Sequence, residues 1–235
     1  MLMIKAAIFL SAVLLLPALP GKGHQAGGAP SFTTPTTITN RYLPLGFLKQ
    51  DILEGTEGGQ DVRIERSFRA DTKVFRVGDQ MVQTLIIEDR VFRKGKLDEV
   101  ALDYFAQGDD GIVYYLGEDV DIYNKKGKVV SHEGAWAFGV NTSQLGVIVP
   151  ANPRVGDKFQ AENVPGITRE DDEVVSVSET VTGPAGTFTN CLKIKETLSD
   201  GEIEFKYYAP GVGVVKEVPA EGELVLKVHA ACSNM

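Results

Sequence analysis

The sequence predicts an all-β fold, a mostly antiparallel sandwich or partly open barrel that forms a single domain. After residue 40, short apolar stretches are separated by Gly, Asp, Asn and Pro at intervals of about eight to twelve residues, which is the spacing of strands joined by tight turns. Apolar and polar residues alternate in segments such as "EVVSVSETV" and "ELVLKVHA", and a period of two is typical of strands.

The N-terminal segment predicts export. Lys5 precedes an apolar run from Ala6 to Leu16, and Pro, Gly and Ala follow it, as in a secretory signal peptide over residues 1–26. The run of about eleven residues is shorter than the roughly twenty that a membrane span needs. We therefore expect a periplasmic or extracellular protein without a transmembrane segment.

Two further boundaries follow from composition. Residues 27–40 are rich in Gly, Pro and Thr and have little to bury, which predicts a flexible leader. Residues 41–231 then form the single all-β domain. A Pro- and Gly-rich loop, "VPANPRVGDKF", lies near the middle of the mature chain and is interpreted as the passage between two sheets of that domain.

The turns between strands can be named from their residues. "RKGKL" and "KKGKV" place Gly95 and Gly127 between alternating segments, and Gly supplies the positive φ of a tight turn. Asp110-Gly111, Asp200-Gly201 and Pro210-Gly211 predict three more turns. "KLDEVALDYF" fits both a helix and a strand, and its place between two hairpin turns favours a strand.

The charge excludes some partners. The chain has 32 acidic and 24 basic residues and a formal charge of -8. Removing residues 1–26 takes away Lys5 and Lys22 and leaves -10. This balance disfavours nucleic acid, whose phosphates require clustered cations, and disfavours anionic membrane surfaces.

Four blocks resemble a family of exported, largely uncharacterised bacterial β-rich proteins. They are "DYFAQGDDGIVYYLGED", "GAWAFGV", "VPANPRVGDKF" and "KYYAPGVGVVKEV", in that order along the chain. The resemblance implies an exported β-rich fold. It supplies no catalytic residues and no specific activity.

Acidic hairpins offer candidate metal ligands. Asp119 and Asp121 alternate with apolar residues, so in a strand they project to the same face, and Asp109 and Asp110 lie in the neighbouring turn. These four carboxylates could hold calcium, although no EF-hand register fits. The simpler interpretation places Asp119 and Asp121 on a solvated face and Asp109 and Asp110 in the turn. The same interpretation applies to the run Glu170–Glu173.

Aromatic residues offer a candidate apolar site. Tyr104, Tyr114, Tyr115, Trp136 and Phe138 lie in or near predicted strands and could either line a ligand cavity or fill the core. Sequence alone does not separate these alternatives.

Catalytic motifs are sparse. The sequence has no G-x-S-x-G, H-E-x-x-H or C-x-x-C pattern. The pattern favours a non-enzymatic exported binding protein that holds a small apolar ligand between β layers. The partner is expected to be such a ligand or a protein. The alternative is a hydrolase or a calcium-dependent module built on the acidic hairpins. Whether Cys191 and Cys232 form a disulfide is left open.

Overall fold

The fold consists of strands and one short 3-10 helix. The computed structural model describes residues 29–232, so the predicted signal peptide lies outside the described residues. The only helix within that range is η1 (Leu45–Phe47), and no helix there is long and apolar enough to cross a membrane. The predicted all-β class is confirmed.

The first half of the chain is an antiparallel meander. Strands β1 to β6 lie side by side in chain order, and β7 and β8 both pair with β5. The strands are β1 (Leu48–Glu57), β2 (Gln60–Val77), β3 (Gln80–Arg93), β4 (Lys96–Gln107), β5 (Val113–Tyr123), β6 (Val129–Ser131), β7 (Trp136–Ala137) and β8 (Gly146–Val149).

The second half is a second antiparallel meander. Its strands also neighbour one another in chain order. They are β9 (Lys158–Val164), β10 (Thr168–Gly183), β11 (Gly186–Leu198), β12 (Ile203–Ala209), β13 (Gly213–Val218) and β14 (Gly222–Ala231). The loop between β8 and β9 coincides with the Pro- and Gly-rich segment, which therefore joins two halves of one sheet.

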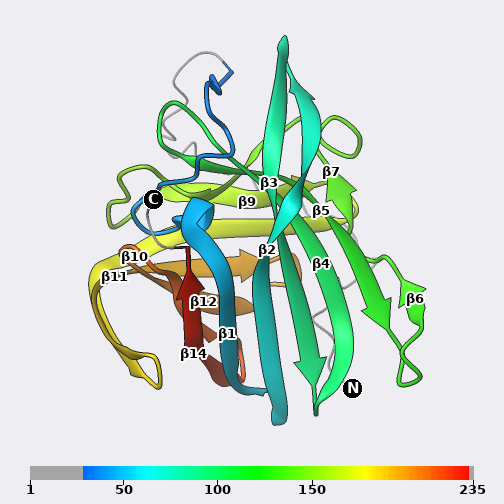
Figure 1. The fold of residues 1–235 in the computed structure, drawn as a ribbon, viewed down its shortest axis with the longest axis vertical. Helices are drawn as coiled ribbons and strands as arrows, with labels where there is room; N and C mark the ends of the chain where they lie inside the picture. The colour runs from blue at the N-terminus through cyan, green and yellow to red at the C-terminus, as the bar shows by residue number, and fades with distance from the viewer. Residues whose placement is uncertain (1–28, 233–235) are drawn as a thin grey trace, which may run out of the picture.

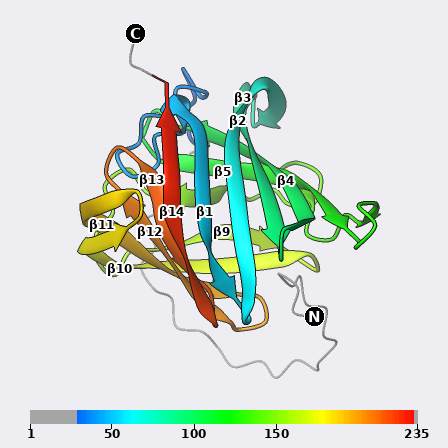
Figure 2. The same cartoon turned by 60° about the horizontal axis from the view of Figure 1, so that its bottom comes forward.

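Pairing of β14 with β1 makes the two meanders one continuous 14-stranded sheet. Figure 2 shows β14 beside β1, and Figure 1 shows β9 and β10 running across the direction of β1 to β4. The sheet thus folds over itself in two layers, without closing into a barrel. β2 and β3 extend as a long hairpin beyond the rest of the sheet (Figure 1).

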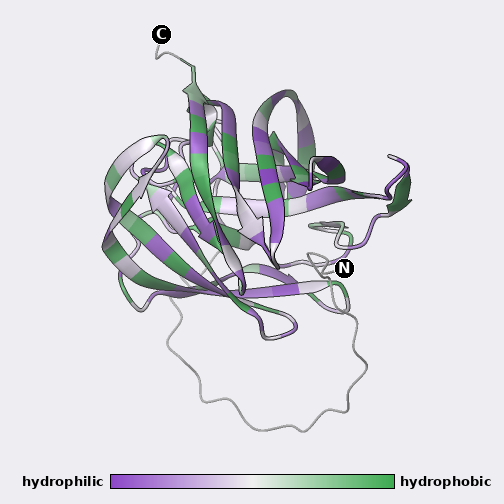
Figure 3. Cartoon of the chain, turned by 90° about the horizontal axis from the view of Figure 1, so that it is seen from below, coloured by the Kyte–Doolittle hydropathy of each residue, from purple (hydrophilic) through white to green (hydrophobic). Residues whose placement is uncertain are grey.

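Two hydrophobic clusters occupy opposite faces of the strands. Apolar and polar residues alternate along them, as the banding in Figure 3 shows, so each strand presents a different set to each face. The larger cluster draws buried residues from both meanders, from Ile38 to Leu226, and forms the core between the layers. The smaller cluster combines Phe75, near the turn of the long β2–β3 hairpin, with Tyr104 of β4 and Tyr114 of β5.

The segment that fitted both a helix and a strand forms a strand, and the predicted tight turns join neighbouring strands. "KLDEVALDYF" lies within β4, so its period of two is the relevant one. At the β3–β4 hairpin, Lys94 and Gly95 have φ of 50° and 71°, which is the signature of a two-residue type I′ turn.

The leader prediction needs correction. Residues 31–40 are attached to one end of the sheet. Ser31 and Thr33 donate hydrogen bonds to Asp109 at 2.7 and 2.8 Å, Gln107 Oε1 accepts from the backbone of Thr39 and Asn40 at 2.8 Å, and Ile38 is fully buried in the main cluster. A composition poor in apolar residues suggested flexibility, but these bonds and one buried Ile hold the segment.

Gly146 brings the two meanders together at their far ends. A Cβ at Gly146 would lie 2.0 Å from the Ala161 carbonyl oxygen of β9 and 3.0 Å from Cβ of Tyr115. Only a residue without a side chain allows β8 to approach β9 this closely.

We expect Gly146→Ala to destabilise the fold by about 1–3 kcal/mol, because β8 must move away from β9. Gly183→Ala is the matched control, since its Cβ would meet Val225 Cβ at an ordinary 3.6 Å. Chemical denaturation of both variants checks this. Equal stability of the two variants would show that the β8–β9 contact is not tight.

Candidate functional site

A cavity of about 310 Å³ lies between the two layers of the sheet. One wall comes from β2 to β5 and the other from β9 to β13. Its volume lies at the lower end of the range for small-molecule sites.

Part of the cavity wall is apolar. Ile64, Ile87 and Phe105 contribute side chains from β2, β3 and β4. Tyr115 of β5 lies beside Phe105 with the two rings stacked at 5.0 Å between centroids. This part of the wall could bury the hydrocarbon portion of a ligand.

The rest of the wall carries a large excess of acidic groups. Eleven carboxyl side chains line the cavity against two cations, Arg66 and Lys206. The carboxyl groups belong to Glu57, Asp89, Glu99, Asp103, Glu118, Glu162, Glu170, Asp172, Glu196, Glu204 and Glu217. Charges removed from water are costly unless they are paired or neutralised. Positive charge or bound protons must therefore neutralise the carboxyl groups of the cavity.

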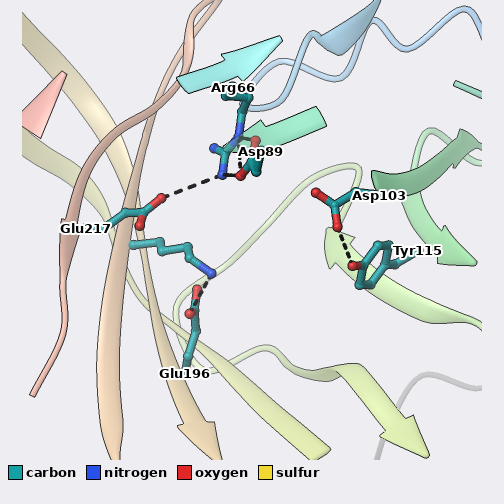
Figure 4. Close-up of polar contacts among 7 residues, drawn as sticks. Arg66, Asp89, Asp103, Tyr115, Glu196 and Glu217 are labelled. Carbon is teal, nitrogen blue, oxygen red and sulfur yellow. Dashed lines mark hydrogen bonds and ion pairs between the residues drawn. The ribbon is translucent and has the colours of Figure 1, made fainter. Parts of the chain in front are cut away.

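Arg66 neutralises part of this negative charge and links the two meanders (Figure 4). It stands opposite Asp89 in the β2–β3 ladder, donating from Nη2 to Oδ2 at 2.6 Å and from Nε to Oδ1 at 2.9 Å. The same Nη2 lies 3.8 Å from Glu217 Oε1 on β13. Burial opposes ionisation of Arg66, but Asp89 and Glu217 outweigh it and hold its pKa well above the usual value.

Lys206 is the second cation. Its Nζ lies 2.9 Å from Glu196 Oε2, and the Glu196 side chain is only 2% exposed. Burial alone would lower the pKa of Lys206, but Glu196 and Glu170 raise it well above its usual value. Lys206 therefore stays charged and neutralises one carboxylate of this group.

Glu170 and Asp172 lie beside this ion pair. Asp172 stands opposite Glu196 in the β10–β11 ladder, and Glu170 is two residues away on the same strand, hence on the same face. Burial, reinforced by the neighbouring carboxylates, raises the pKa of Asp172 to about 10. Burial likewise raises the pKa of Glu170 to about 7 and that of Glu196 to about 8.

A second set of carboxyl groups lies on the β4–β5 wall. Tyr115 donates its hydroxyl hydrogen to Asp103 Oδ1 at 2.7 Å (Figure 4), and burial raises the pKa of Asp103 to about 7. Burial and the charge of Glu162 raise the pKa of Glu118 well above its usual value. Glu162 itself accepts a hydrogen bond from Trp136 Nε1 at 3.0 Å.

These shifts have a common chemical consequence. A carboxyl group whose pKa lies at or above neutrality keeps a proton for much of the time at neutral pH. A cation that enters the cavity can take the place of such protons, because the released carboxylates then face an opposite charge.

The structure divides the five predicted aromatic residues between two faces. Tyr115 lines the cavity. Trp136 packs edge-on against the Tyr115 ring, with 5.2 Å between the two ring centroids. Tyr104 and Tyr114 are buried in the smaller cluster on the opposite face, and Phe138 packs against that cluster. Only Tyr115 of the predicted set thus lines the cavity.

The four predicted metal-ligating carboxylates are not brought together. Asp109 binds the leader, and Asp110 accepts a hydrogen bond from the Tyr114 hydroxyl at 2.7 Å. Among the described residues, the one group of acidic, His or Cys side chains with metal-ligand spacing is Glu170, Asp172 and Glu196.

The strand pair of this predicted site lies on a solvated face, as the simpler interpretation expected. The Asp119 side chain is 61% exposed and lies 3.3 Å from Lys73 Nζ. The Asp121 side chain is 42% exposed and lies 2.9 Å from His132 Nδ1. Both carboxylates have partners of their own.

The interpretation of Glu170–Glu173 as wholly solvated is wrong. Glu170 and Asp172 line the cavity, and Asp172 is only 5% exposed. Asp171, between them, pairs with Arg169 at 2.7 Å, where both side chains are partly exposed. The alternation was visible in the sequence, but acidic residues occupy both faces, so the pattern did not identify the inner one.

The two cysteines are free thiols. Cys191 is buried in the main cluster and Cys232 is exposed at the end of the described chain. Neither residue lines the cavity.

Comparison with known proteins adds little to this geometry. No family model and no curated protein matches the chain. One solved structure, from Parabacteroides distasonis and described as a "putative lipoprotein", aligns with a TM-score of 0.38 at 13% identity over 81% of this chain and 99% of its own.

Glu99 offers a test of the protonated interior. Burial raises its pKa from about 4.5 to about 7, so its contribution to stability is fully present below pH 4.5 and is lost as the pH rises through 7. We expect Glu99→Gln to be more stable than the parent by about 1–2 kcal/mol at pH 8, with the difference vanishing towards pH 4.5. Denaturation across this pH range measures it.

Glu133→Gln is the control, because Glu133 is exposed in the loop after β6. It should leave the pH profile unchanged. A Glu99→Gln profile parallel to that of the parent would contradict a protonated Glu99.

Proposed function

We propose that the protein is a non-enzymatic binding protein whose ligand is a small amphiphilic cation, an amine with a hydrocarbon chain, held in the cavity between the layers. The observation that carries the proposal is the composition of the cavity wall, which combines an apolar surface with eleven carboxyl groups and two cations.

An uncharged apolar ligand fits this wall less well. A hydrocarbon chain would be covered by Ile64, Ile87 and Phe105. An uncharged apolar ligand would, however, remove water from the carboxyl groups without supplying a hydrogen bond or a positive charge. An ammonium group supplies three hydrogen-bond donors and a positive charge. The predicted apolar ligand is therefore refined to one that also carries a cation.

An anion is disfavoured for the same reason. Each of the two cations of the wall already faces carboxylates, Arg66 between Asp89 and Glu217 and Lys206 beside Glu196. A carboxylate or phosphate in the cavity would have to compete with these intramolecular partners. Lys206 itself illustrates how an ammonium group is held in this environment.

The cavity wall lacks one common kind of catalytic machinery. Among the described residues that line the cavity there is no Ser, Cys, Thr or His, so a Ser, Cys or Thr nucleophile activated by an adjacent His is not available in this wall.

Titration calorimetry with octylamine, octanol and octanoate, in the presence of a metal chelator, tests the proposal. We expect octylamine to bind at least about tenfold more tightly than octanol, equivalent to about 1.4 kcal/mol, and octanoate to bind least. Octanol or octanoate binding as tightly as octylamine, or no binding of any of the three, would overturn the proposal.

Substitution locates the binding. Asp103→Asn keeps the shape of a wall residue but removes its charge, and should weaken octylamine binding several-fold. Asp98→Asn is the control on the same strand, because Asp98 is 44% exposed and pairs with Arg93 outside the cavity wall. Equal loss in both variants would argue against binding in the cavity.

A further inference from the structure

Three carboxylates of the cavity wall converge on one point. Glu170 and Asp172 project from β10, and Glu196 projects from β11, where it stands directly opposite Asp172. One oxygen atom from each side chain lies within 4.8 Å of the others. Oxygen atoms around a common cation have this kind of spacing, because each lies about 2.3 to 2.6 Å from a bound calcium ion.

A buried atom without a partner points to a missing ligand. Asp172 is 5% exposed, lines the cavity, and its Oδ1 has no hydrogen-bond partner. Leaving a buried polar atom unpaired costs about 1–3 kcal/mol, and more for a charged group. A cation held among the three carboxyl groups would satisfy this oxygen.

Charge balance indicates the valence of that ligand. Lys206 Nζ contacts Glu196 Oε2 at 2.9 Å, and no other cation of the wall pairs with these three side chains, because Arg66 faces Asp89 and Glu217. When all three carboxyl groups have released their protons, they and the one ammonium group leave two negative charges. A divalent cation neutralises them, whereas a monovalent one leaves a charge behind.

The donor atoms indicate the kind of metal. All three ligands are carboxylates, without the imidazole or thiolate groups that favour zinc or copper. Calcium accepts six to eight oxygen atoms in irregular geometry and can complete its shell with water. The cavity side of the group leaves room for such water.

We propose that Glu170, Asp172 and Glu196 bind one hard divalent cation, of which Ca²⁺ is the probe to use, in the wall of the cavity. This site is distinct from the calcium site that the acidic hairpins suggested, and it does not depend on the proposed amine ligand. The two claims can fail separately, since amine binding is measured with a chelator and calcium binding without an amine.

Calorimetric titration of CaCl₂ into chelator-treated mature protein at about pH 8 tests the site. We expect one calcium ion per chain in the parent and at least about tenfold weaker binding in Asp172→Asn and Glu196→Gln. Asp171→Asn is the matched control, since Asp171 lies between the two ligands of β10 but bonds to Arg169 and Gln160, and it should bind calcium as the parent does.

Two results would overturn the proposal. One is the absence of heat with both CaCl₂ and MnCl₂, accompanied by no rise in melting temperature, which would mean that protons alone neutralise the group. The other is unchanged calcium affinity in Asp172→Asn. Circular dichroism of each variant confirms folding. Glu196→Gln leaves Lys206 without its partner and is expected to be less stable than the parent, whereas Asp172→Asn breaks no ion pair, so Asp172→Asn is the decisive variant.

Discussion

The need to neutralise buried carboxyl groups is the constraint on which the interior of this protein depends. Eleven such groups share a cavity with two cations, and each cation occupies a position that connects strands. Arg66 joins β2 to β3 through Asp89 and reaches β13 through Glu217, and Lys206 joins β12 to β11 through Glu196. Only the Arg66 contact links the two meanders, because Lys206 and Glu196 lie on adjacent strands of the second meander. Most of the carboxyl groups have no positive partner among the described residues.

Such an interior contributes little to stability. Hydrophobic side chains of similar volume are often as stabilising as a buried ion pair, or more so. The apolar cluster that runs from Ile38 to Leu226 and the continuous pairing through β1 and β14 hold the fold together. The raised pKa values of Asp103 and Glu99 reflect above all their burial away from water, which the nearby Arg66 and Arg93 only partly offset.

Local features of the fold were predictable from the sequence. Tight turns such as Lys94-Gly95 follow from residue types that tolerate positive φ, and the period of two identified β4 despite its partial helical spacing. The alternation of side chains between the two faces of a strand also argues against a single site for the predicted aromatic residues. Tyr114 and Tyr115 are adjacent in one strand, so they must face opposite sides of the sheet, and a single pocket could not contain both.

Longer-range features were not predictable. Pairing of β1 with β14 joins residues almost 180 positions apart, as in the contact between Asp51 and His229, and no local pattern specifies it. The inner face of β10 depends on how the sheet folds over, because Glu170 and Asp172 alternate with the equally acidic Asp171 and Glu173. The leader was mistaken for a flexible segment because its few anchors, above all Ile38, act through contacts with distant strands.

A crystal structure of the protein in complex with octylamine would show whether the cavity accepts a cation. We expect electron density inside the cavity, with the amine nitrogen within hydrogen-bond distance of carboxyl oxygens and the hydrocarbon chain against Ile64, Ile87 and Phe105. An empty cavity at saturating octylamine, or octylamine bound only on the outer surface, would rule out the proposed cation site.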